Sequence, residues 1–280
     1  MAGTLFVVGT PIGNLADLSE RARDTLSRVD LIAAEDTRRS GRLLAALGIP
    51  KRALVSFFEG NERERAGELV ARLRDGDSVA LVTDGGMPAV SDPGYRLVAA
   101  ALESGIEVRV VPGPSAAIAA LVASGMPTDR FVFEGFLPRT RAARLARLRS
   151  LAAEPRTIVA FESPKRVRAT LADVIGALGD REVALARELT KLHEEVLRGP
   201  ASGVLDRLGD ADPKGEVVLV LAGAGEAGGE ATTGVFADAV DDARRLVGLG
   251  LRPRDAAKEV ARRSGASANA LYAALTADDG

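Results

Sequence analysis

The chain has 280 residues and a formal net charge of −2, so it is long enough for two ordinary domains and has no global field that attracts nucleic acid or an anionic membrane. The absence of cysteine excludes disulfides, thiolate zinc sites and cysteine nucleophiles. The single histidine, His193, argues against His-rich metal sites and a conventional Ser-His-Asp triad. No apolar run approaches the roughly 18–20 residues that span a bilayer, and the N-terminus lacks the features of a signal peptide. We therefore expect a soluble cytoplasmic protein with no bound metal and no membrane partner.

The first part of the chain alternates apolar strands with amphipathic helices. Strands are expected at residues 4–8, 30–34, 53–57, 79–82 and 106–111, with helices between them at 18–29, 37–47, 62–74 and 95–103. This alternation predicts an α/β domain with a mostly parallel sheet and right-handed crossovers.

Three loops follow these strands and carry the chemically distinctive residues. Gly9–Asn14 has the glycines of a tight turn, but it matches neither the dinucleotide-binding fingerprint nor a Walker A motif. Glu35–Arg39 is a polar run that is either a solvated helix start or a functional cluster. Asp84–Gly94 contains two prolines and three glycines, and it exceeds the usual ~2–6 residues of such a connection. Because open α/β sheets bind ligands at carboxyl strand ends, we favour a binding role for this loop over an ordinary long connection.

The alternating pattern restarts after Pro112–Pro114. Strands are expected at 131–135, 157–161, 182–186, 194–198 and 216–221, the last two as a closing pair, with helices at 115–122, 141–151 and 165–178. A glycine-rich stretch then precedes three short helices at 236–246, 253–263 and 268–275. We therefore divide the chain into domains at 1–112 and 113–223, a linker at 224–234 and a small helical region at 235–280, which is a candidate RNA or ribosome contact.

A basic run occupies the helix expected at 141–151 and the residues before it. Arg139, Arg141, Arg144, Arg147 and Arg149 have no acidic residue among them. A charge run is usually a solvated helix face, but the lack of interleaved acids favours an anionic partner such as an RNA backbone.

Several motifs recur in a specific order along residues 4–222. They are Gly9–Asn14, Glu35–Arg38, Asp84–Gly94, Pro112–Ser115, Phe161–Arg166 and Ala186–Lys191. As a set they resemble the tetrapyrrole-methylase family, and within it the enzymes that methylate ribose 2′-hydroxyls of small-subunit ribosomal RNA. One departure is Gly85, where the family usually has alanine, and this small change should leave the loop shape intact.

The resemblance implies two α/β domains with S-adenosyl-L-methionine in the cleft between them, plus a small helical C-terminal extension. It implies 2′-O-methylation of cytidine 1402 in the 16S rRNA of the small ribosomal subunit, and a homodimer. Matching the family's cofactor site residue by residue gives Pro11, Asp84, Gly85, Gly86, Met87, Val90, Ser115, Ala116, Phe161, Ala186 and Arg187.

A ribose hydroxyl is a poor nucleophile while protonated, so a base or hydrogen-bond acceptor would assist its attack. Position at strand ends makes Glu35, Asp36 and Lys165 the catalytic candidates. The expected RNA contacts are Arg38, Arg39, Arg139, Arg141, Arg144, Arg147, Arg166 and Lys191. Two alternatives stay open, namely a small-molecule methylase of the same fold and a non-catalytic RNA-binding module.

Overall fold

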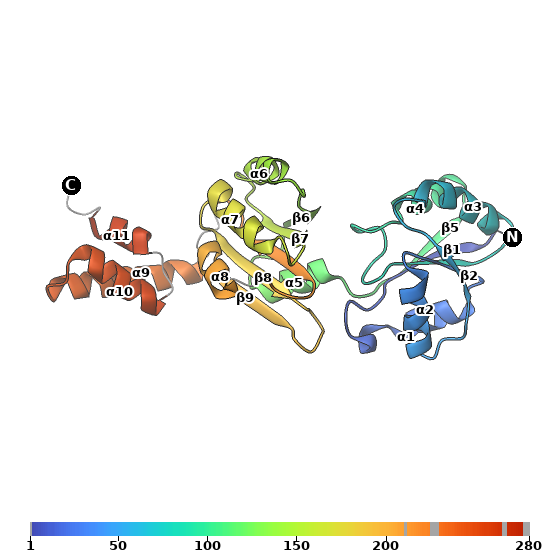
Figure 1. The fold of residues 1–280 in the computed structure, drawn as a ribbon, viewed down its shortest axis with the longest axis horizontal. Helices are drawn as coiled ribbons and strands as arrows, with labels where there is room; N and C mark the ends of the chain where they lie inside the picture. The colour runs from blue at the N-terminus through green and yellow to red at the C-terminus, as the bar shows by residue number, and fades with distance from the viewer. Residues whose placement is uncertain (1, 210–211, 225–229, 265–267, 277–280) are drawn as a thin grey trace.

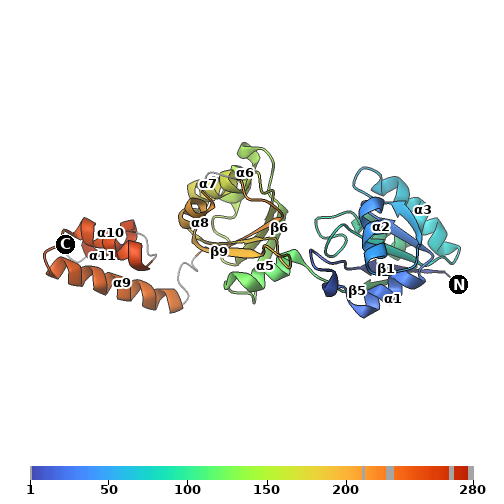
Figure 2. The ribbon, with the colours of Figure 1, turned by 60° about the horizontal axis from the view of Figure 1, so that its bottom comes forward.

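The computed structural model describes residues 2–209, 212–224, 230–264 and 268–276. Two five-stranded sheets and a group of C-terminal helices follow one another along the long axis of the molecule (Figure 1). The N-terminal sheet lies at one end, the second sheet in the middle and the helical group at the other end (Figures 1 and 2).

The N-terminal sheet is entirely parallel, as the sequence predicts. Its strands run in the order β3-β2-β4-β1-β5. Their bounds are β1 Thr4–Val8, β2 Leu31–Ala34, β3 Ala53–Ser56, β4 Val79–Val82 and β5 Glu107–Val111. The strands β2 and β4 are buried at every position because helices cover both faces of the sheet.

Two helix pairs cover this sheet. The helices are α1 Glu20–Arg28, α2 Thr37–Ala46, α3 Glu62–Arg74 and α4 Tyr95–Glu103, and a 3-10 turn η1 spans Leu15–Asp17. On one face, Leu69 and Leu73 of α3 and Leu97 of α4 pack with Leu5 and Leu81 of the sheet. On the other face, α1 and α2 cover the alternate strand positions. The parallel strands therefore end together at one edge, where their loops meet.

The second sheet differs from the expectation of a mostly parallel arrangement. Its order is β6-β7-β10-β8-β9, and only β6 and β7 are parallel neighbours. Its strands are β6 Phe131–Phe136, β7 Thr157–Glu162, β8 Glu182–Arg187, β9 Glu195–Pro200 and β10 Val217–Leu221. The prediction that the last two strands pair with each other is wrong, because β10 inserts between β7 and β8 whereas β9 forms the edge beside β8.

Helices again cover both faces of the second sheet. The helix α5 (Ala116–Ser124) packs Ala117, Ala120 and Leu121 against one face. The helices α6 (Arg141–Ser150), α7 (Val167–Leu178) and α8 (Ala201–Leu208) pack against the other. The sequence analysis did not predict α8.

The C-terminal helices α9 (Glu230–Gly248), α10 (Pro253–Ser264) and α11 (Ala268–Thr276) share a separate core. Ala243, Ala257, Val260 and Leu271 are buried in it. The helix α9 begins at Glu230, so the expected linker ends earlier than residue 234, and residues 225–229 of that linker lie outside the described residues. Among the described helices, none combines the length and apolar character needed to cross a membrane.

Candidate functional site

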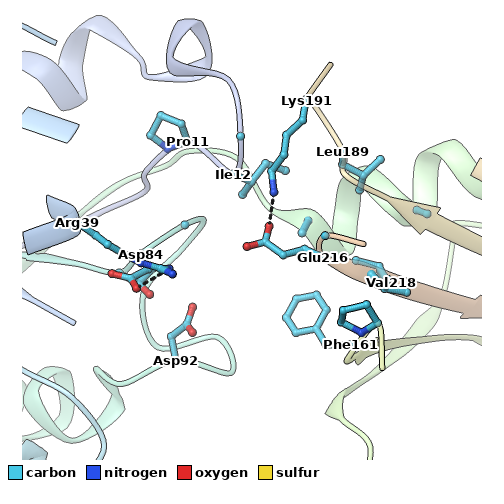
Figure 3. Close-up of a pocket in the computed structure, with 18 of the residues that line it drawn as sticks. Pro11, Ile12, Arg39, Asp84, Asp92, Phe161, Leu189, Lys191, Glu216 and Val218 are labelled. Carbon is cyan, nitrogen blue, oxygen red and sulfur yellow. Dashed lines mark hydrogen bonds and ion pairs between the residues drawn. The ribbon is translucent and has the colours of Figure 1, made fainter. Parts of the chain in front are cut away.

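A cleft of about 650 Å³ separates the two sheet domains, and it lies where the sequence analysis places the ligand (Figure 3). This volume falls in the usual range of roughly 300–1,000 Å³ for small-molecule sites. The loops after β1, β2 and β4 form its first wall. Residues of β7, β8 and β10 and the loops beside them form most of the opposite wall. Carboxyl strand ends thus supply one whole side of the cleft, as expected for an open parallel sheet.

Close backbone packing holds the loops of the first wall together. Thr10 and Gly86 exchange backbone hydrogen bonds of 2.9 and 3.1 Å, and Gly86 has a φ of +94°. A side chain at Gly9 would come within 2.6 Å of the Cα atom of Gly113 in the domain junction. Glycine is needed at these positions because a Cβ atom would clash or strain the backbone. The loop after β1, the central loop and the junction therefore act as one unit.

Three carboxylates gather on the first wall of the cleft. Glu35, Asp84 and Asp92 all line it, and Arg39 donates from Nη1 to Asp84 Oδ2 at 3.0 Å (Figure 3). The Thr83 hydroxyl donates to Glu35 Oε2 at 2.6 Å. Asp84 Oδ1 is buried and has no hydrogen-bond partner within the protein. Among the described residues, no group of three or more His, Cys, Asp or Glu side chains is arranged to hold a metal ion.

The proximity of these carboxylates perturbs their protonation. Burial, reinforced by the negative charge of Glu35, raises the pKa of Asp84, although Arg39 opposes the shift. Burial, again reinforced by Glu35, raises the pKa of Asp92 to about 6. A wall of crowded, partly desolvated carboxylates is an environment that favours a cationic ligand.

The opposite wall is mainly apolar. Phe161, Ala186, Leu189 and Val218 line it, and the Phe161 ring lies in an edge-on contact with Phe133 at a centroid distance of 5.0 Å. Figure 3 shows Phe161, Leu189 and Val218 across the cleft from Asp84 and Asp92. An apolar surface with an exposed aromatic edge suits a planar ring.

Lys191 and Glu216 form an ion pair at the edge of this wall. The Lys191 Nζ atom lies 3.1 Å from Glu216 Oε2 and 2.8 Å from Glu188 Oε1. Burial opposes the charge of Lys191, but the hydrogen bonds to both glutamates outweigh it and raise the pKa of this ammonium. Lys191 therefore stays charged at the cleft.

The structure brings together most, but not all, of the expected cofactor residues. Those that line the cleft are Pro11, Asp84, Gly85, Ala116, Phe161 and Ala186. Those that lie outside its lining are Gly86, Met87, Val90, Ser115 and Arg187. A Cβ atom at Gly85 would be 3.4 Å from the Pro11 carbonyl oxygen, which is ordinary contact, so an alanine also fits there.

The structure places the three catalytic candidates in different environments. Glu35 lines the cleft, but it is already engaged by Thr83. Asp36 is the N-cap of α2 and accepts hydrogen bonds from the backbone N–H groups of Arg39 and Arg38, which lower its pKa. Lys165 is exposed and does not line the cleft. Asp36 and Lys165 are therefore poorly placed for proton transfer inside the cleft.

Three arginines of the basic run, Arg141, Arg144 and Arg147, pair with acids from other elements, which the sequence of the run itself does not show. Arg144 is buried and donates to Asp173 of α7 at 2.7 Å, where Arg141 also binds. Arg147 makes a bidentate pair with Glu134 of β6 at 2.6 and 2.9 Å. Burial disfavours the ionised form of Asp173, but the two arginines hold its pKa below the usual value. Arg144 is therefore a packing residue rather than an RNA contact.

The remaining basic candidates lie at several points around the cleft. Arg39 and Lys191 line it, whereas Arg38 and Arg139 are exposed and do not belong to its lining. Arg166 pairs with buried Glu162 at 2.5 Å, and its Nη1 atom is buried without a hydrogen-bond partner.

Among the cleft residues that sequence reasoning did not assign to the site are Thr83, Asp92, Leu189 and Glu216. Thr83 directly precedes Asp84 and could have been found from its place at the end of β4. Asp92 sits in a Ser-Asp-Pro-Gly sequence that is typical of turns, so its residue type gave no signal of a cleft position.

The fold and the cleft define a two-domain α/β protein with a small-molecule site between its two sheets. The family model of the Tetrapyrrole (Corrin/Porphyrin) Methylases matches residues 4–204, and the chain belongs to this family. The ribosomal RNA small subunit methyltransferase I of Thermotoga maritima is 51% identical over 79% of this chain and 99% of the relative. The protein of the same name from Mesorhizobium japonicum is 45% identical over 97% of this chain and 90% of the relative.

A solved structure shows the same fold at lower similarity. The uroporphyrin-III C-methyltransferase of Thermus thermophilus, in complex with S-adenosyl homocysteine, aligns with a TM-score of 0.54 and 21% identity, covering 79% of this chain and 97% of the other. The expected fold class and family are thus confirmed, and S-adenosylmethionine as methyl donor agrees with them.

Proposed function

We propose that this chain transfers a methyl group from S-adenosyl-L-methionine to small-subunit ribosomal RNA, at the ribose 2′-hydroxyl of cytidine 1402 in 16S rRNA. The observation that carries the proposal is the cleft itself, in which an acidic wall faces an apolar wall at the carboxyl ends of the first sheet. The names of relatives that match at 45–51% identity support ribosomal RNA as the substrate.

The residues of the cleft fit this cofactor. The sulfonium is cationic and suits the wall of Glu35, Asp84 and Asp92, whereas the adenine suits the apolar surface around Phe161 and Leu189. The unpartnered Asp84 Oδ1 atom can accept a hydrogen bond from an amine or hydroxyl of the ligand. The bound cofactor supplies an already activated methyl carbon. The protein then has to align the acceptor, exclude water and receive one proton.

Basic residues at the cleft margin are the proposed RNA contacts. Arg38 and Arg39 lie in the first turn of α2, just after β2, whereas Arg139 follows β6 and Lys165 follows β7. Arg39 lines the cleft, and each of the other three lies within three residues of a lining residue along the chain. We retain Arg141, Arg147, Arg166 and Lys191 in this set as second partners of phosphate, since each already binds a carboxylate. Such contacts position RNA without reading its sequence.

The direct test uses cofactor labelled in its methyl group. The protein is incubated with assembled small subunits, with free 16S rRNA and with tetrapyrrole precursors, and nuclease digestion locates the labelled nucleotide. Label in a 2′-O-methylcytidine at position 1402 supports the proposal. Label only in tetrapyrrole overturns it in favour of a small-molecule methylase, and RNA binding without cofactor binding in calorimetry favours a non-catalytic module.

We also propose that the protein works in the cytoplasm as a homodimer, as the resemblance implies. The chain mass is 29.1 kDa. Light scattering that gives twice this mass at working concentration supports a dimer, and a monomer mass contradicts it.

A further inference from the structure

Of the three carboxylates on the first wall of the cleft, Asp92 is the one that no described residue holds by an ion pair or by a hydrogen bond from the backbone. Glu35 accepts hydrogen bonds from the Thr83 hydroxyl at 2.6 Å and from the Asp84 backbone N–H at 3.3 Å. Asp84 is paired with Arg39 at 3.0 Å. Within the described part of the chain, no lysine or arginine pairs with Asp92, and its polar neighbour is the Thr83 hydroxyl. Because one hydroxyl has one proton, and Thr83 gives it to Glu35, Asp92 is left as an open acceptor.

The loop that carries Asp92 is held in a strained conformation. Ala89 and Ser91 have φ values of 68° and 63°, a left-handed backbone conformation that is strained for a residue with a Cβ atom. The Ala89 N–H donates to the Pro93 carbonyl at 3.3 Å, and the Gly94 N–H donates to Glu62 Oε1 at 2.9 Å. Backbone strain of this kind persists only where the surroundings fix it, and here it fixes the direction in which Asp92 points.

The same loop reaches the second domain. The Ser91 hydroxyl lies where a Cβ atom at Gly135 of β6 would come within 3.0 Å of it. Figure 3 shows the Asp92 carboxylate pointing into the open space between Asp84 and the wall that carries Phe161. Asp92 is therefore placed between Asp84 of the first wall and the wall contributed by the second domain (Figure 3).

We propose that Asp92 is the general base that accepts the proton of the attacking ribose hydroxyl, an inference that rests on the proposed function. As the hydroxyl oxygen forms its bond to the methyl carbon, the carbon–sulfur bond breaks and sulfur keeps the electron pair. The hydroxyl proton moves to an oxygen of Asp92 and is later released to water. The charges balance, because a sulfonium and a carboxylate become a neutral thioether and a carboxylic acid.

The surroundings of Asp92 suit this role. Burial and the nearby Glu35 raise its pKa to about 6, and a general base works best when its pKa lies near the operating pH. The other charged groups of the cleft are Arg39 and Asp84 on the same wall and Glu162, Lys191 and Glu216 opposite. Asp36 is occupied as a helix cap and Lys165 lies outside the cleft, so neither competes for this proton.

The test compares Asp92→Asn with Asp75→Asn, which removes the same charge from an exposed residue just after α3 in the same domain. We expect Asp92→Asn to lower the single-turnover methylation rate by roughly 10²–10⁴-fold. Calorimetric affinities for S-adenosylmethionine and for RNA should stay within about twofold of wild type, and Asp75→Asn should keep the full rate.

The wild-type rate should rise with pH up to about 6 and then level. The methylation rate of Asp92→Glu should still rise with pH in the acidic range, whereas the rate of Asp92→Asn should not.

A second readout does not depend on turnover. Carbon-13 NMR can follow the titration of the aspartate carboxyl groups, and the Asp92 signal is assigned as the one that is missing from Asp92→Asn. Without RNA, this signal should titrate near pH 6. When S-adenosylmethionine is bound, it should titrate at a lower pH. A wild-type rate in Asp92→Asn, or an Asp92 titration that ignores the cofactor, overturns the inference. If wild-type protein and Asp92→Asn label RNA equally well, the proposed role of Asp92 is overturned but the proposed methyl transfer to RNA stands. If wild-type protein labels no RNA, the proposed function itself fails.

Discussion

Asp92 should cost the folded protein stability at neutral pH. Its pKa is about 6 in the folded chain against 3.8 for a free aspartate, so the folded state binds more protons than the unfolded state between these values. The free energy of unfolding therefore falls as pH rises through this window, and the full penalty is present above about pH 6. For a partly buried group we place the penalty on the order of 1–2 kcal/mol.

Replacing Asp92 by asparagine should remove this penalty. Calorimetry of Asp92→Asn at pH 7.5 should give a higher Tm than wild type, and the difference should shrink below pH 6 and vanish near pH 4. Asp75→Asn serves as the charge-matched control and should show no such trend. A Tm difference that is constant with pH would mean that the gain comes from packing and not from ionisation.

Asp84 should contribute mainly to cofactor affinity. Its Oδ1 atom is buried without a partner, so a ligand donor there would form a hydrogen bond to a charged acceptor. Asp84→Ala should weaken S-adenosylmethionine binding by about 10–100-fold in calorimetry, with little change in RNA affinity. The loss should be smaller for S-adenosylhomocysteine, whose sulfur is neutral. Equal losses for the two ligands and for RNA would instead indicate a structural role for the loop.

Residue positions in the cleft were predictable where they depend on strand ends. Glu35 is the first residue after buried strand β2 and Asp84 the second after buried strand β4, and these parallel neighbours carry both residues to one edge. Asp92 was not predictable in this way, because its direction depends on positive φ values at Ala89 and Ser91. Alanine and serine give no signal of such a conformation, unlike glycine.

Among the elements, α6 shows how a basic helix can be structural. Arg144 is 4% exposed, and its guanidinium binds Asp173 of α7, which is itself buried. Arg144→Ala should lower the free energy of unfolding by about 3–5 kcal/mol, because it leaves a buried carboxylate with Arg141 as its remaining arginine. Urea unfolding measures this change. The exposed Arg149→Ala on the same helix should alter stability by less than about 0.5 kcal/mol.

The opposite result would support the sequence-based prediction that this helix binds RNA. If Arg144→Ala keeps wild-type stability but weakens RNA binding, its side chain is available to RNA. The sequence could not reveal the burial, because Asp173 lies 29 residues further along the chain. A run of arginines without neighbouring acids predicts an anionic partner only when no acid reaches it from another element.

The elements of the first sheet were predicted more fully than the order of the second. Hydrophobic patterns located α3 and α4 at their observed bounds and the five parallel strands to within about one residue, as local periodicity allows. The position of β10 depends on a long-range pairing with β7 and β8, which no local pattern encodes. The helix α8 escaped notice because it has only eight residues and includes Gly203, a poor helix former.

At the scale of the whole molecule, the C-terminal helices are set apart from the two sheet domains that form the cleft (Figure 1). They bury their own core, which includes Ala243, Ala257 and Leu271, and they extend away from the second sheet (Figures 1 and 2). The Thermotoga maritima relative is covered to 99% by 79% of this chain, so a protein of this family exists without about a fifth of the present length. Among the residues that the structure describes, none beyond Val218 lines the cleft. We therefore expect the two sheet domains to be sufficient for cofactor binding.

A variant that ends at Ala224 tests whether the sheet domains bind the cofactor without the C-terminal helices and whether those helices contribute to RNA binding. We expect it to fold and to bind S-adenosylmethionine with wild-type affinity in calorimetry, because the cleft and both sheets are intact. RNA affinity should fall, and the slope of log affinity against log salt should become shallower, because Arg252, Arg254, Lys258 and other cations of the tail are removed. Full-length protein with Arg252 and Arg254 changed to glutamine is the matched control and should lose part of the same slope. If the shortened protein binds RNA with an unchanged salt dependence, phosphate is held by the cleft margin alone. The helical tail would then have to act on another surface of the small subunit.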